Sequence, residues 1–292
     1  MTSAHENLLS VNAYLAPAEQ DPSSFAKQAA RAGFGGVGWT QAMLQAVGAS
    51  ELRKISDGEG LVVTSLNSAG YFTWPDAARQ QQQDRVNLQL IDDAAVLGAR
   101  QLVVITGGID GGLDAAPSRQ SMRDARARVE IGLTALDRRA AASDVRLGLE
   151  PIHPADHLRK GCINSIDDAL SLCRALKVTD LVIDTFHSAW DRALLDLRSI
   201  AGDRLGCIQV CNWFEPSPEA KPSRCLPDDG RLDLAAITGG LLSGGYAGPI
   251  EFEMFDIHRR GRSVESLLDA AHRQISALLE QSDTTEAARA GA

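Results

Sequence analysis

The chain has 292 residues, a length that suits one large α/β barrel or two small domains. Its hydrophobic content of 44% can supply a sizeable core, and its 38 acidic against 29 basic residues give a net charge of −9. So acidic a chain is a poor candidate for nucleic-acid binding, which requires clustered positive charge.

The sequence shows no sign of membrane insertion or secretion. No apolar run reaches the roughly 18 residues that a membrane span needs. The N-terminal MTSAHENLL lacks the basic and apolar regions of a signal peptide, so we expect a cytoplasmic protein. The five cysteines are odd in number and form no CxxC pair, which indicates neither a disulfide framework nor a zinc site.

Short apolar runs typical of buried parallel strands alternate with helical patterns along nearly the whole chain. The first helix ends at a candidate C-cap, Gly33, and a later one opens near a capping box, Ser165-x-x-Asp168. In chain order the sequence predicts a strand at 8–16, a helix at 23–33, strands at 33–40 and 60–68, a helix at 85–99, a strand at 100–108, a helix at 122–143, a strand at 145–154, a helix at 165–177, strands at 179–187 and 205–213, a helix at 234–245, a strand at 248–255 and a helix at 263–281.

Eight strands alternating with helices predict an α/β fold built as a single (β/α)8 TIM barrel over residues 1–281. The small polar residues of 282–292 predict a disordered C-terminal tail. A doubly wound open sheet is the alternative, but no GxGxxG or P-loop string supports a nucleotide-binding fold.

Three carboxylates close apolar strands at the end where such barrels carry their activity. Glu150 ends LGLE, Asp184 ends LVID and Glu253 ends IEFE. A lone charge is costly there unless something compensates it, although each residue could also face water or pair with an arginine. Gln209 adds a neutral amide oxygen from the strand at 205–213. Three carboxylates and an amide suit one Mg²⁺ or Mn²⁺ ion better than structural Zn²⁺.

Residues 140–275 resemble the sugar phosphate isomerase/epimerase family, also called xylose isomerase-like TIM barrels. The matching strings are LGLEPIHP, VIDTFHSAWD, IQVCNW, RCLPDDGRLDL and, most specific, GGYAGPIEFEMF. The resemblance implies that Glu150, Asp184, position 209 and Glu253 hold one metal ion. The chain departs from the family with Gln209 for the usual His and Asn212 for the usual Asp. Some dehydratases similar to the family use Gln as a ligand, so the site is expected to persist while the reaction type stays open.

Further residues are candidates for contact with substrate. The resemblance assigns this role to His187 and Arg224, which without it are a capping histidine and a solvated loop charge. His153 follows Glu150, and Trp39 lies near a strand end, so either could line the pocket or serve only in local packing. Glu251 shares the inward parity of Glu253, one layer deeper.

The ligand set predicts the chemistry. A divalent ion polarises a carbonyl and an adjacent hydroxyl, and Glu150 and Glu253 then remove and return the proton. We expect a metal-dependent isomerase or epimerase of a keto sugar or related polyol, acting through an enediolate. The alternative is a dehydratase or lyase that eliminates a β-hydroxyl from an oxo-sugar, inosose or dehydroshikimate-like substrate.

Two other functions carry less support. An abasic-site endonuclease with the same barrel resembles a three-zinc protein rich in His, whereas this chain has six His and a net charge of −9. A barrel that only binds a ligand is disfavoured by the three intact carboxylates. The expected partner is a small, unphosphorylated carbohydrate-like molecule, and homodimer and homotetramer both remain open.

Overall fold

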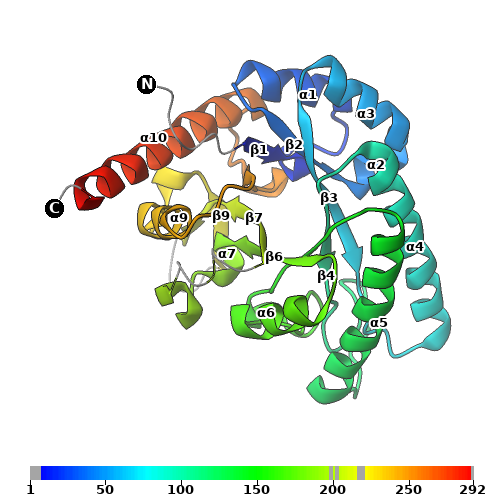
Figure 1. The fold of residues 1–292 in the computed structure, drawn as a ribbon. Coiled ribbons are helices and arrows are strands. Elements are labelled where there is room, and N and C mark those ends of the chain that lie inside the picture. Colours follow the sequence, from blue (N-terminus) through cyan, green and yellow to red (C-terminus); the bar gives the residue numbers. More distant parts are fainter. Residues whose placement is uncertain (1–7, 197–199, 201–203, 216–220, 291–292) are drawn as a thin grey trace.

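The fold is a closed barrel of eight parallel strands, as the sequence predicts (Figure 1). The computed structural model describes residues 8–196, 200, 204–215 and 221–290. β1 pairs with β2 on one side and with β10 on the other, which closes the sheet. The barrel strands are β1 (Leu9–Asn12), β2 (Gly36–Thr40), β3 (Val62–Gly70), β4 (Gln101–Ile105), β5 (Leu147–Leu149), β6 (Thr179–Asp184), β7 (Leu205–Val210) and β10 (Ile250–Phe252).

Helices surround the strands on the outside of the barrel (Figure 1). Their apolar faces and the outward side chains of the strands share one buried core, which includes Phe25, Leu133 and Leu268. The helices are α1 (Pro22–Arg31), α2 (Gln41–Val47), α3 (Ala49–Gly58), α4 (Ala77–Leu97), α5 (Met122–Ala142), α6 (Ile166–Ala175), α7 (Thr185–Ser188), α9 (Leu234–Ser243) and α10 (Val264–Ala290).

The predicted helix signals act as expected. Gly33 follows α1 with a φ of 100°, a conformation that glycine adopts without strain. Ser165 caps α6 by accepting a hydrogen bond from the backbone N–H of Asp168 at 3.2 Å. The reciprocal bond of a capping box is missing, because the Asp168 carboxylate pairs with Arg126 at 2.8 Å instead.

Several elements differ from the sequence prediction. α2 and α3 lie between β2 and β3, where the sequence pattern predicts no helix. α4 begins eight residues before the predicted 85, because the Asp76 carboxylate caps it by accepting a hydrogen bond from Arg79 N at 2.7 Å. α10 continues through 282–290, where a disordered tail was expected; alanine and glutamate in that stretch favour helix. Residues 291–292 lie outside the described part of the chain.

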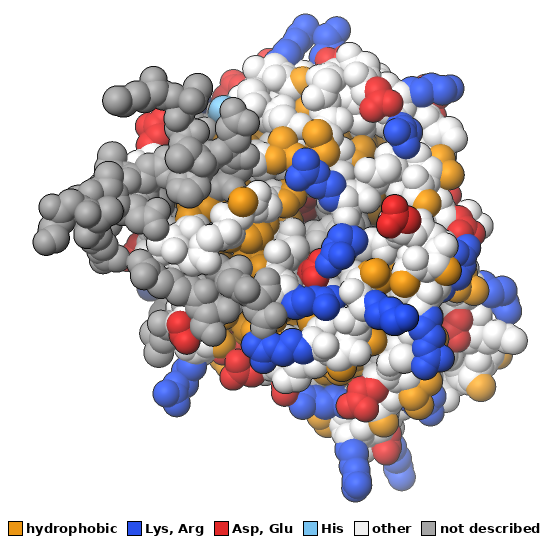
Figure 2. Space-filling view, viewed as in Figure 1, with side chains coloured by type: hydrophobic (Ala, Val, Ile, Leu, Met, Phe, Trp, Pro, Cys, Tyr) orange, Lys and Arg blue, Asp and Glu red, His pale blue; other side chains and the backbone are white. Residues whose placement is uncertain are grey.

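An antiparallel hairpin follows β7 at the mouth of the barrel. It consists of β8 (Asn212–Phe214) and β9 (Ser223–Cys225), with Trp213 opposite Arg224. On the face drawn in Figure 2, the described basic and acidic side chains are interspersed, with hydrophobic atoms in small groups between them. Among the described helices, none is long and apolar enough to cross a membrane.

Candidate metal centre

The three predicted carboxylates lie together at the carboxyl ends of their strands. Glu150 directly follows β5, Asp184 is the last residue of β6, and Glu253 directly follows β10. All three are buried, with exposed fractions of 3%, 0% and 3%. Charged groups removed from water to this extent need a cation or strong donors nearby.

A cavity of about 580 Å³ opens above these carboxylates. Glu150 and Glu253 line it, and so do His153 and His187. Its walls come from the segments that follow the barrel strands, and they include the rings of Tyr14, Phe186, Trp213 and Phe255. A concave pocket that combines aromatic rings with polar and charged side chains has the size and character of a small-molecule site.

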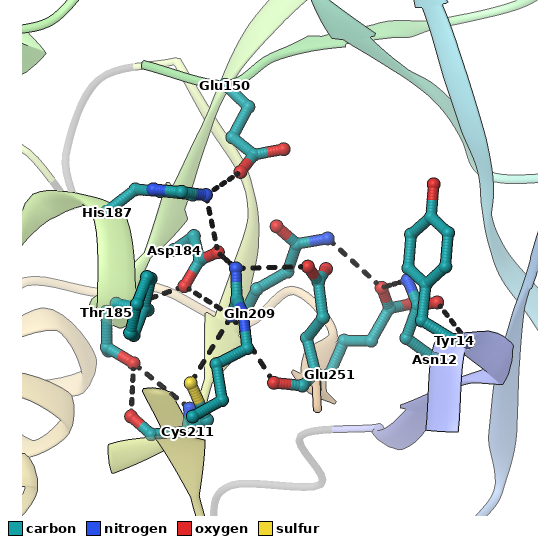
Figure 3. A network of polar contacts seen from close by, with 12 residues as sticks. Asn12, Tyr14, Glu150, Asp184, Thr185, His187, Gln209, Cys211 and Glu251 are labelled. Carbon is teal, nitrogen blue, oxygen red and sulfur yellow. Dashed lines mark hydrogen bonds and ion pairs between the residues drawn. The ribbon is translucent and has the colours of Figure 1, made fainter. Parts of the chain in front are cut away.

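Glu150, Asp184 and His187 each offer one donor atom, and these atoms lie within 4.8 Å of one another. His187 Nε2 is 3.8 Å from Glu150 Oε1 and 3.9 Å from Asp184 Oδ2 (Figure 3). Glu150 Oε1 is buried and has no hydrogen-bond partner among the described residues. Carboxylate and imidazole donors converging beside an unsatisfied oxygen fit a bound divalent cation.

Gln209 is fully buried on β7, in register with Asp184 on β6. Its Nε2 donates to Glu251 Oε1 at 3.3 Å, while its own Oε1 has no hydrogen-bond partner in the described part of the chain. A buried carbonyl oxygen without a partner is the second atom here that a cation would satisfy. Gln209 and Glu253 are not among the three residues grouped above, so the four-residue ligand set stays a prediction.

Arg224 lies against the carboxylates instead of facing the cavity. The hairpin β8–β9 buries its side chain completely. Nη1 donates to Asp184 Oδ1 at 3.1 Å, and Nη2 contacts both Asp184 Oδ2 and, at 3.3 Å, Glu253 Oε1. The guanidinium therefore joins two predicted ligands, and the direct substrate contact implied by the resemblance is not what this geometry shows.

Burial dominates the electrostatics of the site. It raises the pKa of Glu150 to about 7, with Lys160 opposing the rise and Asp184 adding to it. Burial also raises the pKa of Glu253 well above its usual value, although Arg224 counteracts it. The pKa of His187 is lowered well below its usual value by burial and then by Lys160. Shifts of this kind are typical of acid–base groups in active sites.

These shifts predict how the stability of the metal-free protein depends on pH. The folded state holds the Glu150 proton up to about pH 7, whereas the unfolded chain releases it near the usual pKa of 4.5. The folded state therefore binds more protons between these values, and the free energy of unfolding falls as the pH rises, by at most about 1.4 kcal/mol per pH unit for one group. Thermal unfolding with EDTA should show a steeper loss for wild type than for Glu150→Gln; equal slopes would contradict the raised pKa.

The two remaining predicted residues have different surroundings. His153 lines the cavity between the rings of Trp190 and Trp213, with centroids at 6.2 and 5.9 Å. Trp39 is fully buried, and its Nε1 donates to Ser56 Oγ of α3 at 3.0 Å. The indole thus points outward from the barrel, and Trp39 packs between the barrel and the helices. Of the two roles that the sequence left open for Trp39, the structure shows packing and not contact with the cavity.

Lys160 and Tyr14 line the cavity but were missed in the sequence. Lys160 Nζ lies 2.7 Å from His187 Nε2, yet in the loop string ADHLRKGC nothing distinguishes it from its basic neighbour. Tyr14 follows the end of β1 at Asn12, within the range 8–16 that was predicted to be all strand. A prediction that ended the first strand at Asn12 would have located the Tyr14 hydroxyl at the mouth of the barrel.

Comparisons with known proteins agree with the barrel fold. The family described as xylose isomerase-like TIM barrel matches residues 26–278. A solved protein of Sinorhizobium meliloti 1021 is 24% identical, with a TM-score of 0.83 over 93% of this chain and 98% of that one. An L-ribulose 3-epimerase is 21% identical, with a TM-score of 0.75 over 98% of both chains.

A third solved structure is the IolI protein with a zinc atom, 15% identical, with a TM-score of 0.78 over 94% of this chain and 98% of that one. No curated protein sequence matches the chain significantly. At these identities the solved structures show the fold alone, whereas the family match spans most of the sequence. The chain belongs to the xylose isomerase-like TIM-barrel family.

Proposed function

We propose that this protein is a divalent-metal-dependent isomerase or epimerase of a keto sugar or a related polyol derivative. The observation that carries the proposal is that donor atoms of Glu150, Asp184 and His187 lie within 4.8 Å of one another, beside a cavity that Glu150 and His187 line. The family match and the epimerase among the structural neighbours support the substrate class.

Glu150, Asp184, Gln209 and Glu253 would hold one ion, for which Mn²⁺ or Mg²⁺ suits the oxygen donors. His187, which lies beside the first two, would be a fifth neighbour. When bound, a divalent ion polarises a carbonyl and stabilises the negative charge of an enediolate. The two buried oxygens without partners, on Glu150 and Gln209, are the atoms of this chain that such an ion would satisfy.

The protein's own groups supply proton transfer and orientation. Glu150 lines the cavity, and its carboxylate would take a proton from the substrate and return it. Glu253 lines the same cavity and would serve the second face of the substrate. Arg224 holds the Glu253 carboxylate by its contact at 3.3 Å. The aromatic walls would bind the apolar faces of a sugar and exclude water.

Lys160 is expected to donate a hydrogen bond to a substrate oxygen beside His187. Its ammonium lines the cavity and has no carboxylate partner among the described residues. Lys160→Met keeps the length of the side chain but removes the donor, which should raise KM about 10-fold, the value of one charged hydrogen bond. Steady-state kinetics would check this, and unchanged KM and kcat would remove Lys160 from the site.

β-Elimination from an oxo-sugar, inosose or dehydroshikimate-like compound is the second candidate. The pair Lys160–His187, 2.7 Å apart, favours it because a departing hydroxyl needs a proton donor away from the base. Solvent deuterium that enters the substrate without loss of water supports isomerisation. A new conjugated ultraviolet absorbance supports elimination, and in that case Lys160→Met should lower kcat more than it raises KM.

A further inference from the structure

A carboxylate that the proposed reaction does not use lies inside the barrel, one layer beneath the metal site. Glu251 is fully buried on β10. Its Cα is in register with Ser10 on β1 and with Gln209 on β7, so the three side chains share the inner face. The carboxylate therefore lies between the first strands of the barrel and the strand that carries a predicted ligand.

The chain surrounds this carboxylate with donors. Asn12 Nδ2 lies 2.9 Å from Oε1, and the hydroxyls of Thr64 and Ser65 each lie 2.8 Å from Oε2. Ser65 Oγ accepts a hydrogen bond from Asn67 Nδ2 at 2.8 Å, which leaves its own hydrogen for Glu251. These contacts fix the carboxylate in one orientation.

Space for the carboxylate is also reserved. A Cβ atom on Gly38 of β2 would lie 2.3 Å from Ser65 Oγ and 2.5 Å from Glu251 Oε2. Such distances are far inside van der Waals contact, so any side chain at position 38 would displace one of the two groups. Glycine is required here by the close approach of the carboxylate.

Ser10 Oγ also donates to Oε2 at 3.4 Å, and the amide nitrogen of Gln209 lies 3.3 Å from Oε1 (Figure 3). A carboxylate only accepts hydrogen bonds. The opposite orientation of the amide would bring its oxygen against the Glu251 oxygen. The nitrogen of Gln209 is therefore held towards Glu251, and the oxygen points away from it without a hydrogen-bond partner among the described residues. That oxygen is the buried, partnerless Oε1.

We infer that Glu251 is a positioning residue: it binds the amide N–H of Gln209 and thereby presents the amide oxygen to the cation. The inference rests on the proposed metal-dependent function. It explains how glutamine can occupy a position where the resembling family has histidine. The side-chain amide carries an oxygen and a nitrogen, and only the oxygen can bind a cation. An acceptor that binds the nitrogen therefore fixes which of the two atoms faces the cation. Groups that orient a metal ligand from behind typically change metal affinity about 10- to 100-fold when replaced.

The test is Mn²⁺ affinity, measured on the full-length protein by the electron paramagnetic resonance signal of free Mn²⁺. Glu251→Gln should weaken the Kd about 10- to 100-fold. The double variant Gln209→Glu, Glu251→Gln exchanges the two side chains. The N–H donor is then at position 251, and a carboxylate oxygen at position 209 faces the cation. This double variant should bind Mn²⁺ at least as tightly as wild type.

Asp137→Asn is the matched control. Asp137 is a buried carboxylate at a remote place and accepts bonds from Val178 N at 2.9 Å and Thr179 Oγ1 at 2.8 Å. Its replacement should lower the melting temperature but leave the Mn²⁺ Kd at the wild-type value. A loss of affinity caused merely by disturbing a buried carboxylate would appear in this variant too, and would contradict the inference.

The remaining outcomes separate the two proposals. Wild-type protein that binds no Mn²⁺ overturns the metal-dependent function and the inference with it. Wild type that binds Mn²⁺ while Glu251→Gln binds it equally well overturns only the role of Glu251. A folded double variant that binds Mn²⁺ as weakly as Glu251→Gln also overturns only the role of Glu251, because the exchanged pair keeps the proposed hydrogen bond.

Discussion

Glu150→Gln and Glu253→Gln are each expected to lower kcat by about 10²- to 10⁴-fold, the usual contribution of a general acid–base group. An amide has nearly the shape of the carboxyl group but cannot take a proton from carbon. The readout is turnover of candidate keto sugars and oxo-polyols, together with incorporation of solvent deuterium at the carbon next to the carbonyl.

Deuterium exchange separates the roles of the two glutamates. If each serves one face of the substrate, one variant should still exchange the substrate proton without completing the reaction, and the other should show no exchange. Glu130→Gln, the same replacement on the exposed face of α5, is the control and should match wild type. Near wild-type turnover in either site variant would end its assignment as a base.

Removal of the metal is the second change with a large expected effect. Treatment with EDTA should abolish turnover, and Mn²⁺ should restore it. Ligand binding stabilises the folded state by RT ln(1 + [L]/Kd), about 2.7 kcal/mol at a hundredfold excess over Kd. Mn²⁺ should therefore raise the melting temperature of the EDTA-treated protein, which differential scanning fluorimetry measures directly.

Asp184→Asn should remove this Mn²⁺-dependent rise, because it takes away a buried ligand at the centre of the cluster. The variant also leaves Arg224 without its closest carboxylate, so its melting temperature should fall in every buffer. Only the increment caused by Mn²⁺ is diagnostic. Asp180→Asn, on the same strand but paired with Arg146 and Arg204 at the opposite end, should keep the full increment. A full increment in Asp184→Asn would contradict the ligand role.

Much of the fold was predictable because the barrel repeats one simple pattern. Strands buried on both faces appear in the sequence as apolar runs, and a charged residue that closes such a run lies at the carboxyl end of the strand. Glu150, Asp184 and Glu253 were selected in this way, and the structure places them at that end of the barrel. The additional helices α2 and α3 were missed because they lie in one connection, where regular alternation of strand and helix offers no guide.

The parts of the site that were not predicted depend on loops. Lys160 reaches His187 from a connection whose path is set by tertiary contacts, and Arg224 is buried by a hairpin that the strand pattern does not reveal. The sequence placed Trp39 near a strand end, and this position alone does not give the direction of its side chain. In the structure the adjacent Gly38 faces Glu251 inside the barrel, so Trp39 points outward and its indole reaches Ser56.

The hydrogen bonds around Glu251 have a consequence for how such barrels can be recombined. The predicted cation ligands all belong to the later strands, β5 to β10, whereas Asn12, Gly38 and Thr64, which fit around Glu251, belong to β1, β2 and β3. A chimera that joined the ligand-bearing half of this chain to the front half of a relative would keep every predicted ligand but lose these donors to Glu251, and with them the proposed orientation of Gln209. A working chimera would therefore have to carry the residues around Glu251 together with the strands that bear the predicted ligands.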